Sequence, residues 1–359
     1  MSSRLSRGKL SLAILAGSAL LTPAAMAQET HEVTDGVGRV VTLPVNVDTI
    51  VSGFFPFPSA FFIGTGSLDK LQAVGADSKH AAERSVFGKI VPDILDLPSS
   101  PIQGGVLNAE ELLKLAPDVY VTHEGNAALE VAERAGVPTL VLDVHSKGKG
   151  DTVIAFESWM NVVGQVTGDA LRTDELIDYA KTTQQDIRNT MARLDASQKP
   201  GALFFARLGE DQLMVNGSGG FGNFWLNEGG ATNLAAEGFA ATGEIGMEQI
   251  YAFNPEAIFI TNLSPTQPED LYENRIPDQD WSHVKAVQNE RVYKVPEGVF
   301  QWYVPNGDVP MMLKWMAQSV HPELYADYDF AADLKAYYQR FYNYALSDAD
   351  VAAILKPTF

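Results

Sequence analysis

The chain has 359 residues, of which 26 are lysine or arginine, 45 are aspartate or glutamate and none is cysteine. Hydrophobic residues make up 46% and charged residues 20%, which excludes a disordered chain and supplies apolar material for about two globular domains. The formal net charge of −19 disfavours a nucleic-acid-binding protein, and the lack of cysteine excludes disulfides, thiolate metal sites and cysteine nucleophiles.

Residues 1–27 have the pattern of a secretory signal peptide. Three basic residues precede an apolar run at 10–21, which is too short to span a hydrocarbon core of about 30 Å as a helix. Ala25-Met26-Ala27 then supplies the small residues that signal peptidase requires. We therefore expect cleavage after Ala27, which leaves a soluble periplasmic protein that begins at Gln28.

The sequence after the signal peptide alternates between predicted strands and helices, beginning with a hairpin at Val33–Leu43. Strand patterns lie at Thr49–Phe55, Gln72–Ala76, Val119–Thr122 and Thr139–Val144, and helix patterns lie at Ser59–Leu68, Ala109–Leu115 and Ala127–Ala135. Strands that alternate with helices predict a parallel sheet with helical crossovers.

A long helical region follows at Thr152–Leu194 and is interrupted once, at Thr167-Gly168-Asp169. From Asp169 onward apolar residues recur at three- and four-residue steps, which predicts a helix of about 39 Å at 1.5 Å per residue. Lys199-Pro200-Gly201 ends this region, and Ala202–Ala206 begins a second series of strands.

The segment Glu110–Val121 is similar, position by position, to the later segment Glu248–Phe259. In both, an acidic residue opens a helix pattern, a proline ends it, and an apolar strand follows. This similarity predicts an internal duplication with one helix–proline–strand unit in each of two lobes. Because the helix dipole favours an acidic residue at this position, capping alone is enough to explain the two glutamates.

Several motifs occur in a fixed order along the chain: Thr49–Ser52, Ser59–Gly66, Leu71–Gly75, Gly104-Gly105, Glu110–Val121, Gly229–Asn233, Asp280-Trp281, Asn289–Tyr293 and Tyr303–Tyr325. Their order and spacing resemble those of the periplasmic binding proteins for ferric siderophores, haem and vitamin B12. These proteins are the ligand-capturing subunits of ABC importers, and the resemblance covers nearly all of the mature chain.

The resemblance implies an α/β fold of two lobes, each a mostly parallel sheet flanked by helices, joined by one long rigid linker helix. The expected boundaries are 28–150 for the first lobe, 151–197 for the linker region and 198–359 for the second lobe. The resemblance also implies a monomeric binding protein without a cofactor, not an enzyme, that works with an ABC permease and its ATPase subunits. The docking glutamates of the family correspond to Glu110 and Glu248, with Glu111 as a substitute for Glu110.

Candidate ligand-binding residues are those that follow the predicted strands, because ligands of open α/β sheets bind beyond the carboxyl ends of the strands. Aromatic side chains suit a large, partly apolar metal chelate, glycine lets the backbone approach a ligand, and arginine suits an anionic ligand. The candidates are Phe55, Phe57, His80, Arg84, Gly105, His123, His145, Arg207, Trp302 and Tyr303.

A ferric siderophore is the expected ligand, and haem, a nickel–amino-acid complex, cobalamin and molybdate are alternatives. The B12 binders of the family carry a tryptophan shortly before each docking glutamate. The stretches before Glu110 and Glu248 contain no tryptophan, so cobalamin is less favoured as the ligand. The histidines are not closely paired, so direct capture of a bare metal ion is not indicated, although His123 or His145 could complete the coordination of a chelated metal.

Two further motifs are typical of other functions, but neither occurs here with the features that normally accompany it. Gly217, Gly219 and Gly222 match a dinucleotide-binding fingerprint, but the strand before them is short. Ser67-Leu68-Asp69-Lys70 matches the first element of penicillin-interacting serine enzymes, whose other elements, Ser-Asp-Asn and Lys-Thr-Gly, are missing from the sequence. A periplasmic hydrolase is therefore the alternative from another class.

Overall fold

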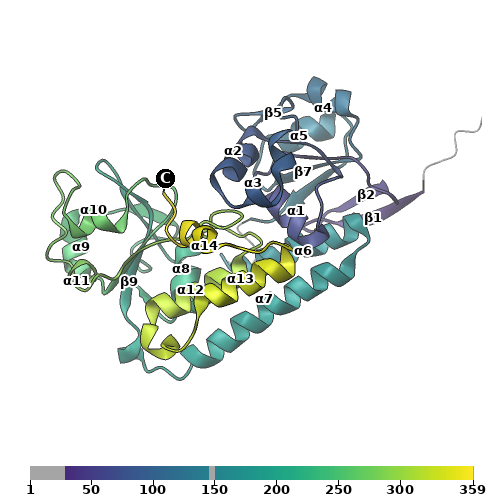
Figure 1. The fold of residues 1–359 in the computed structure, drawn as a ribbon. Helices are drawn as coiled ribbons and strands as arrows, with labels where there is room; N and C mark the ends of the chain where they lie inside the picture. The colour runs from purple at the N-terminus through teal and green to yellow at the C-terminus, as the bar shows by residue number, and fades with distance from the viewer. Residues whose placement is uncertain (1–28, 145–149, 359) are drawn as a thin grey trace, which may run out of the picture.

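The computed structural model describes residues 29–144 and 150–358 and contains two lobes, each built around a β-sheet (Figure 1). In this view the first lobe lies at the upper right, the second lies at the left, and long helices run beneath them. Residues 1–27, the expected signal peptide, and His145 lie outside the described residues. No helix within 29–144 and 150–358 is long and apolar enough to cross a membrane.

The sheet of the first lobe is parallel and has the strand order β4-β3-β7-β8. Its strands are β3 (Ile50–Ser52), β4 (Leu71–Val74), β7 (Val119–His123) and β8 (Thr139–Leu142). Every residue of β3 and β8 is buried, which is typical of a parallel sheet covered by helices on both faces. The helices of this lobe are α1 (Phe57–Thr65), α2 (Ala76–Arg84), α3 (Phe87–Ile90), α4 (Ala109–Leu115) and α5 (Ala128–Arg134), with a 3-10 turn at Pro92–Leu95. Two hairpins accompany them, β1 (Thr30–Thr34) with β2 (Val40–Pro44) and β5 (Ile102–Gln103) with β6 (Val106–Leu107).

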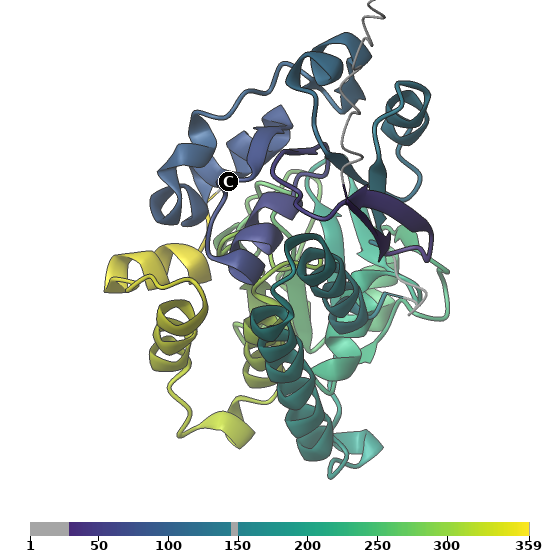
Figure 2. The ribbon, with the colours of Figure 1, turned by 90° about the vertical axis from the view of Figure 1, so that its right-hand side faces the viewer.

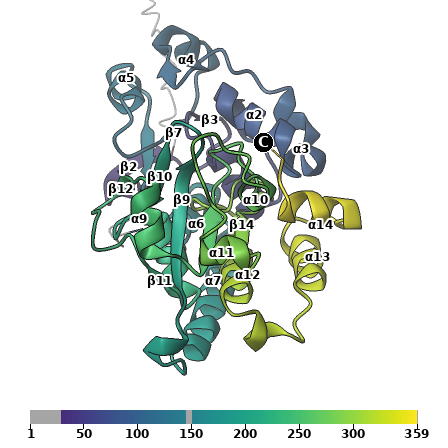
Figure 3. The same cartoon turned by 90° about the vertical axis from the view of Figure 1, so that its left-hand side faces the viewer.

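The sheet of the second lobe is mixed, with the order β12-β10-β9-β13-β14 and with β11 paired to β9. Its strands are β9 (Gly201–Leu208), β10 (Leu213–Asn216), β11 (Thr232–Asn233), β12 (Thr242–Glu244), β13 (Ala257–Ile260) and β14 (Val292–Lys294). The strand β10 is antiparallel to both of its neighbours, and the pairs of β9, β11, β13 and β14 are parallel. The helices of this lobe are α8 (Phe221–Glu228), α9 (Met247–Phe253), α10 (Pro268–Tyr272) and α11 (Lys285–Gln288). Figure 3 shows α9 and α11 in front of this sheet, and side chains from α9, α10 and α11 join the buried cluster there.

Two long helices follow β8 and lead to the second lobe. Asp151 caps α6 (Thr152–Thr167) by accepting hydrogen bonds from the amides of Val153 and Ile154, and the helix ends at Gly168 with φ 74°. The predicted break at 167–169 is thus confirmed. The next helix, α7 (Ala170–Met191), packs along α6 (Figure 2) and contacts α1 of the first lobe and α8 of the second. It is 22 residues long, because the chain turns at Ala192 and does not continue as a helix to Leu194.

The C-terminal helices follow the second sheet, and the later part of this segment reaches the first lobe. They are α12 (Val309–Val320), α13 (Phe330–Phe341) and α14 (Asp348–Leu355), with two further 3-10 turns in the chain at Ala196–Gln198 and Pro322–Tyr325. Phe62 of α1 stacks on Tyr342 with ring centroids 6.4 Å apart, and Lys89 of α3 lies 2.6 Å from a carboxylate oxygen of Asp350 in α14. The segment assigned to the second lobe therefore also holds the first.

One buried apolar cluster extends from the first lobe through α6 and α7 into the second. It includes Phe61 of α1, Trp159 of α6, Ile187 of α7 and Phe204 of β9, and all four are buried. Because protein interiors are close-packed and cannot be sheared without loss of contacts, this cluster ties the two lobes together.

The predicted helix–proline–strand unit is confirmed in both lobes. The helices α4 and α9 are each seven residues long, and the strands β7 and β13 follow them at equivalent positions. Leu112 and Ile250, which occupy the same position of the repeated unit, are both completely buried. The equivalence holds therefore for individual side chains as well as for the elements.

Candidate ligand-binding and docking sites

Two predicted residues at the carboxyl ends of the sheets are accessible to a ligand. Phe55, which follows β3, is 41% exposed, and its ring packs against Phe300 of the second lobe at 5.2 Å between centroids. Arg207 is exposed at the end of β9, and its guanidinium forms no hydrogen bond or ion pair with any residue that the structure describes. An exposed aromatic ring and a cation without an anionic partner are side chains that suit an anionic ligand with apolar parts.

His123 ends β7 and has both of its ring nitrogens engaged. Its Nδ1 lies 2.9 Å from the carbonyl oxygen of Glu124, and its Nε2 lies 3.2 Å from the side-chain amide nitrogen of Asn126. A proton on Nδ1 satisfies both contacts, because Nδ1 then donates to the carbonyl and Nε2 accepts from the amide. A metal ion can reach Nε2 only if Asn126 turns away. In the described parts of the chain, no three His, Asp or Glu side chains are grouped so that they could hold a metal ion.

Arg84 lies in a pocket of about 340 Å³ whose walls come from both lobes. Its Nη2 is 3.9 Å from Oε1 of Glu297, while Lys89 in the same pocket pairs with Asp350. Next to Arg84, the hydroxyl of Ser85 donates to the carbonyl oxygen of Val299 at 3.4 Å. These contacts join α2 and α3 of the first lobe to the loop after β14 and to α14.

Glu297 is a largely buried carboxylate of this pocket, with its side chain 11% exposed. Burial raises its pKa, although Arg84, a hydrogen bond from Asn262 and Lys294 act in the opposite direction. The amide of Asn262 donates to Oε2 at 3.1 Å, whereas Oε1 accepts no hydrogen bond from the described residues. Lys294 is also buried and donates to the carbonyl oxygens of Ser264 and Thr266, at 2.6 and 2.9 Å. Burial lowers the pKa of Lys294 to about 8.

Trp302, Tyr303 and Phe57 are packed in the interior, which corrects the expectation that they line the ligand site. The indole of Trp302 is fully buried and donates to Asp308 at 2.8 Å. The hydroxyl of Tyr303 donates to Oδ1 of Asn216 at 2.8 Å, and burial raises its pKa to about 12. Phe57 is 3% exposed and packs on Phe61 of the same helix.

His80 and Gly105 lie apart from the strand ends. His80 is exposed on α2, where Nδ1 lies 3.2 Å from Oε2 of Glu83. Gly105, with φ 76°, belongs to the tight turn between β5 and β6, a conformation that glycine adopts without strain. Its role in this conformation is to make that turn.

Glu297 and Phe300 are contact residues that the sequence prediction missed. Both follow β14, so the strand-end rule would have found them if Val292–Lys294 had been recognised as a strand. Asn126 was missed because an asparagine near a turn is common and carries no signal of its own.

Glu110 and Glu248 are both exposed, at equivalent positions in α4 and α9. Asn108 caps α4, and its Oδ1 accepts hydrogen bonds from the amides of Glu110 and Glu111 at 3.0 and 3.2 Å. The carboxylate of Glu111 pairs with Lys114 on the same helix, whereas Glu110 forms no ion pair within the described residues. In the second lobe the position of Glu111 is taken by Gln249, which caps its own helix by accepting from the amide of Gly246. These observations favour Glu110 over Glu111 as the counterpart of Glu248.

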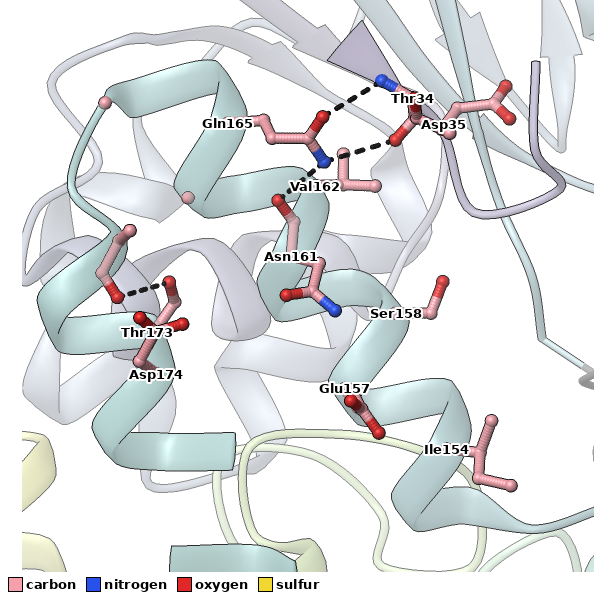
Figure 4. Close-up of a pocket in the computed structure, with 13 residues that line it drawn as sticks. Thr34, Asp35, Ile154, Glu157, Ser158, Asn161, Val162, Gln165, Thr173 and Asp174 are labelled. Carbon is pink, nitrogen blue, oxygen red and sulfur yellow. Dashed lines mark hydrogen bonds between the residues drawn. The ribbon is translucent and has the colours of Figure 1, made fainter. Parts of the chain in front are cut away.

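A groove of about 710 Å³ opens beside α6 and α7 and contains none of the predicted site residues (Figure 4). Gln165 lines this groove, where it accepts from the amide of Thr34 at 3.0 Å and donates to the carbonyl oxygens of Thr34 and Asn161. Glu157 pairs with Lys181 at 2.6 Å. Because these polar groups are already satisfied within the protein, the groove is a weaker candidate for ligand binding than the strand ends.

Comparisons with known proteins identify the family and the fold of this chain. The sequence profile of a periplasmic binding protein family matches residues 68–298. The chain is 22% identical over 273 residues to the molybdate-binding protein MolA of Haemophilus influenzae, an alignment that covers 71% of this chain and 75% of that protein. It is 24% identical over 229 residues to an uncharacterized ABC transporter substrate-binding lipoprotein of Bacillus subtilis, YvrC, covering 62% and 67% of the two chains.

Solved structures show the same fold. A periplasmic solute-binding protein from Veillonella parvula superimposes with a TM-score of 0.82 at 27% identity, covering 91% of this chain and 97% of the other. The nickel–histidine complex of CeuE from Helicobacter pylori superimposes with a TM-score of 0.68 at 23% identity, covering 91% and 99%. The chain is therefore a member of the periplasmic binding protein family, a substrate-binding protein of an ABC transporter and not an enzyme.

Proposed function

We propose that this binding protein captures an anionic metal chelate, with a ferric siderophore as the first candidate, between its lobes. The observation that carries the proposal is Arg207, which is exposed at the end of β9 and has no anionic partner among the described residues. A guanidinium binds carboxylate or catecholate oxygens through paired hydrogen bonds. The exposed ring of Phe55, at the corresponding end of the first sheet, supplies the apolar contact that such a chelate offers.

Molybdate is the second candidate ligand, because the relative in Haemophilus influenzae is named for binding it. Arg207 suits a small oxyanion as well as a chelate, but Phe55 distinguishes the two. A small tetrahedral oxyanion has no apolar surface to place against a phenyl ring, so only a chelate should depend on Phe55. Other solved relatives are named for nickel–histidine and for haem, so both ligands are included in the binding experiment below.

The ligand proposal is tested by titrating the purified mature protein with ferric hydroxamate and catecholate siderophores, haem, nickel with histidine, and molybdate. We expect one ferric siderophore to bind, Arg207→Ala to weaken binding by about tenfold (~1.4 kcal/mol), and Phe55→Ala to weaken it as well. Arg193→Ala is the matched control, because Arg193 is also exposed but lies beyond the end of α7. If only molybdate binds, and Phe55→Ala does not change its affinity, the siderophore proposal is wrong and the ligand is an oxyanion.

Delivery to the permease is proposed to depend on Glu110 and Glu248. One exposed carboxylate on each lobe can pair with basic residues on the two halves of a permease and so fix the orientation of docking. The double variant Glu110→Arg, Glu248→Arg should abolish uptake into cells while leaving ligand affinity intact. The double variant Glu130→Arg, Glu237→Arg, at exposed positions outside α4 and α9, is the control for the change in net charge. Normal uptake by the double variant would reject this role.

We also infer that the protein works in the periplasm as a monomer, together with a permease and its ATPase subunits. Removal of the signal peptide predicts that protein isolated from the periplasm begins at Gln28. Intact mass spectrometry checks the cleavage site, and light scattering coupled to gel filtration checks the monomer. A protein that retains residues 1–27 contradicts the proposed cleavage, and a protein that elutes as a dimer contradicts the proposed monomer.

A further inference from the structure

The repeated helices α4 and α9 each expose one large apolar side chain at the same position. Leu113 is 51% exposed and Tyr251 is 41% exposed, and the separation between them in sequence equals that between Glu110 and Glu248. Single exposed apolar residues are normal on protein surfaces. However, no other two of the large exposed apolar residues in the described chain are related by this spacing.

The exposed apolar residue lies on the same side of each helix as the glutamate. Leu113 follows Glu110 by three residues, and Tyr251 follows Glu248 by three, and side chains at this spacing are neighbours on a helix surface. The next position toward the N-terminus, Leu112 in α4, is fully buried, as is its equivalent in α9, so the two helices present the same face to solvent. Each lobe therefore displays a carboxylate beside an apolar side chain.

The tyrosine of this pair is held in place before any partner binds. Its hydroxyl donates to the backbone carbonyl oxygen of Asp280 at 2.6 Å, across the loop that precedes α11. A ring fixed in this way loses little side-chain entropy when a partner covers it. Tyr251 is thus a preorganised contact surface.

We propose that Leu113 and Tyr251 are permease-contact residues, each covered by an apolar surface of the permease next to the basic residue that pairs with the neighbouring glutamate. The inference rests on the proposed docking role of Glu110 and Glu248. Figure 1 places α4 at the far end of one lobe and α9 at the far end of the other, so a partner that contacts both must span the molecule. A permease with two equivalent halves fits a pattern of charge and apolar surface that occurs once on each lobe.

The test measures the affinity of the ligand-free protein for the permease–ATPase complex of its own transport system, held in nanodiscs, by surface plasmon resonance. Leu113→Ser and Tyr251→Ser should each weaken binding by about tenfold (~1.4 kcal/mol). Tyr251→Phe keeps the ring and should bind within about threefold of the wild type. Leu171→Ser and Leu324→Ser, at positions 85% and 44% exposed on other elements, are the matched controls and should bind like the wild type.

The same assay separates this inference from the docking proposal. Glu110→Arg with Glu248→Arg tests the glutamates alone, and thermal unfolding confirms that each variant is folded. If the serine variants bind like the wild type, the apolar contacts are wrong, whatever the arginine variant does. If the serine variants lose affinity while the controls keep it, the apolar contacts are established, even when the arginine variant shows that the glutamates are dispensable.

Discussion

Ala116 and Asn254, at equivalent positions of the repeated unit, adopt nearly the same left-handed backbone conformation, with φ 44° and ψ 54° at the first and φ 40° and ψ 61° at the second. Each ends a seven-residue helix, and a proline follows each. A residue before proline is disfavoured in the right-handed helical region, which helps to end both helices. The two lobes thus use the same turn with different residues, and this left-handed conformation is more strained for alanine than for asparagine.

Replacing Ala116 by glycine should therefore stabilise the protein. The Cβ of Ala116 opposes the left-handed conformation, and its removal should raise the free energy of unfolding by about 1 kcal/mol. Asn254→Gly is the comparison and should not gain this stability, because it also removes the hydrogen bond that Asn254 Oδ1 accepts from the amide of Lys285 at 3.0 Å. Urea unfolding at constant pH measures both, and a loss of stability in Ala116→Gly would contradict the assignment of strain to this residue.

Trp302→Phe should lower stability without changing ligand affinity. Asp308 is completely buried and accepts hydrogen bonds from Trp302 at 2.8 Å, Tyr338 at 2.7 Å and Tyr342 at 2.9 Å. Burial raises the pKa of Asp308 despite these donors, so the loss of one of them leaves the carboxyl less satisfied. We expect the free energy of unfolding to fall by about 1–3 kcal/mol. If the variant keeps its stability but binds the ligand more weakly, Trp302 is a ligand-binding residue after all.

The stability contribution of Lys294 should depend on pH. Burial lowers its pKa from 10.5 to about 8, so below that pH the folded protein holds a charge that it disfavours. Between pH 8 and 10.5 the unfolded chain keeps the proton and the folded protein releases it, so the free energy of unfolding rises with pH in this window.

This effect is measured by comparing the wild type with Lys294→Met, in which the titrating group is lost. The wild type should gain about 2 kcal/mol relative to the variant between neutral pH and the upper end of that window, allowing for partial solvent access. Urea unfolding of both proteins at the two pH values provides the comparison. A constant difference in stability between the two proteins would show that Lys294 does not titrate in this way.

The pair between Lys89 and Asp350 joins the first lobe to α14, and its removal should have a modest, salt-dependent effect. Burial alone would raise the pKa of Asp350, but hydrogen bonds from Lys89 and Ser347 outweigh it and lower the pKa. Because Lys89 is largely exposed and Ser347 still holds the carboxylate, Lys89→Met should cost about 1 kcal/mol at neutral pH. The difference should shrink in about 1 M sodium chloride, where exposed charges are screened. An unfolding free energy that differs equally at low and high salt would point to lost packing by the lysine stem.

The parts of the fold that short segments determine could be predicted from the sequence. The apolar strand at 119–122, the break at Gly168 and the helix before Pro117 all depend on neighbouring residues, and each is found where expected. The strand expected at 139–144 is also present, but it ends at Leu142. The antiparallel strands β10 and β12 were not expected, because their pairing depends on contacts across the sheet.

The candidate site was predicted less well, because burial of an aromatic side chain depends on distant partners. The sequence places Trp302 in a loop next to proline, but its burial depends on Asp308 together with Tyr338 and Tyr342 of the C-terminal helices. The contact of Lys89 with Asp350 joins residues that are 261 positions apart and leaves no local pattern. By contrast, Arg207 and Phe55 were correctly placed at strand ends, since that position follows from the strands themselves.

The apolar cluster shared by α1, α6, α7 and β9 has a consequence for how the protein loses its structure. Neither half has a complete interior without side chains supplied by the other. The two halves should therefore melt together in one cooperative transition, and a gene fragment encoding only one of them should yield an insoluble product.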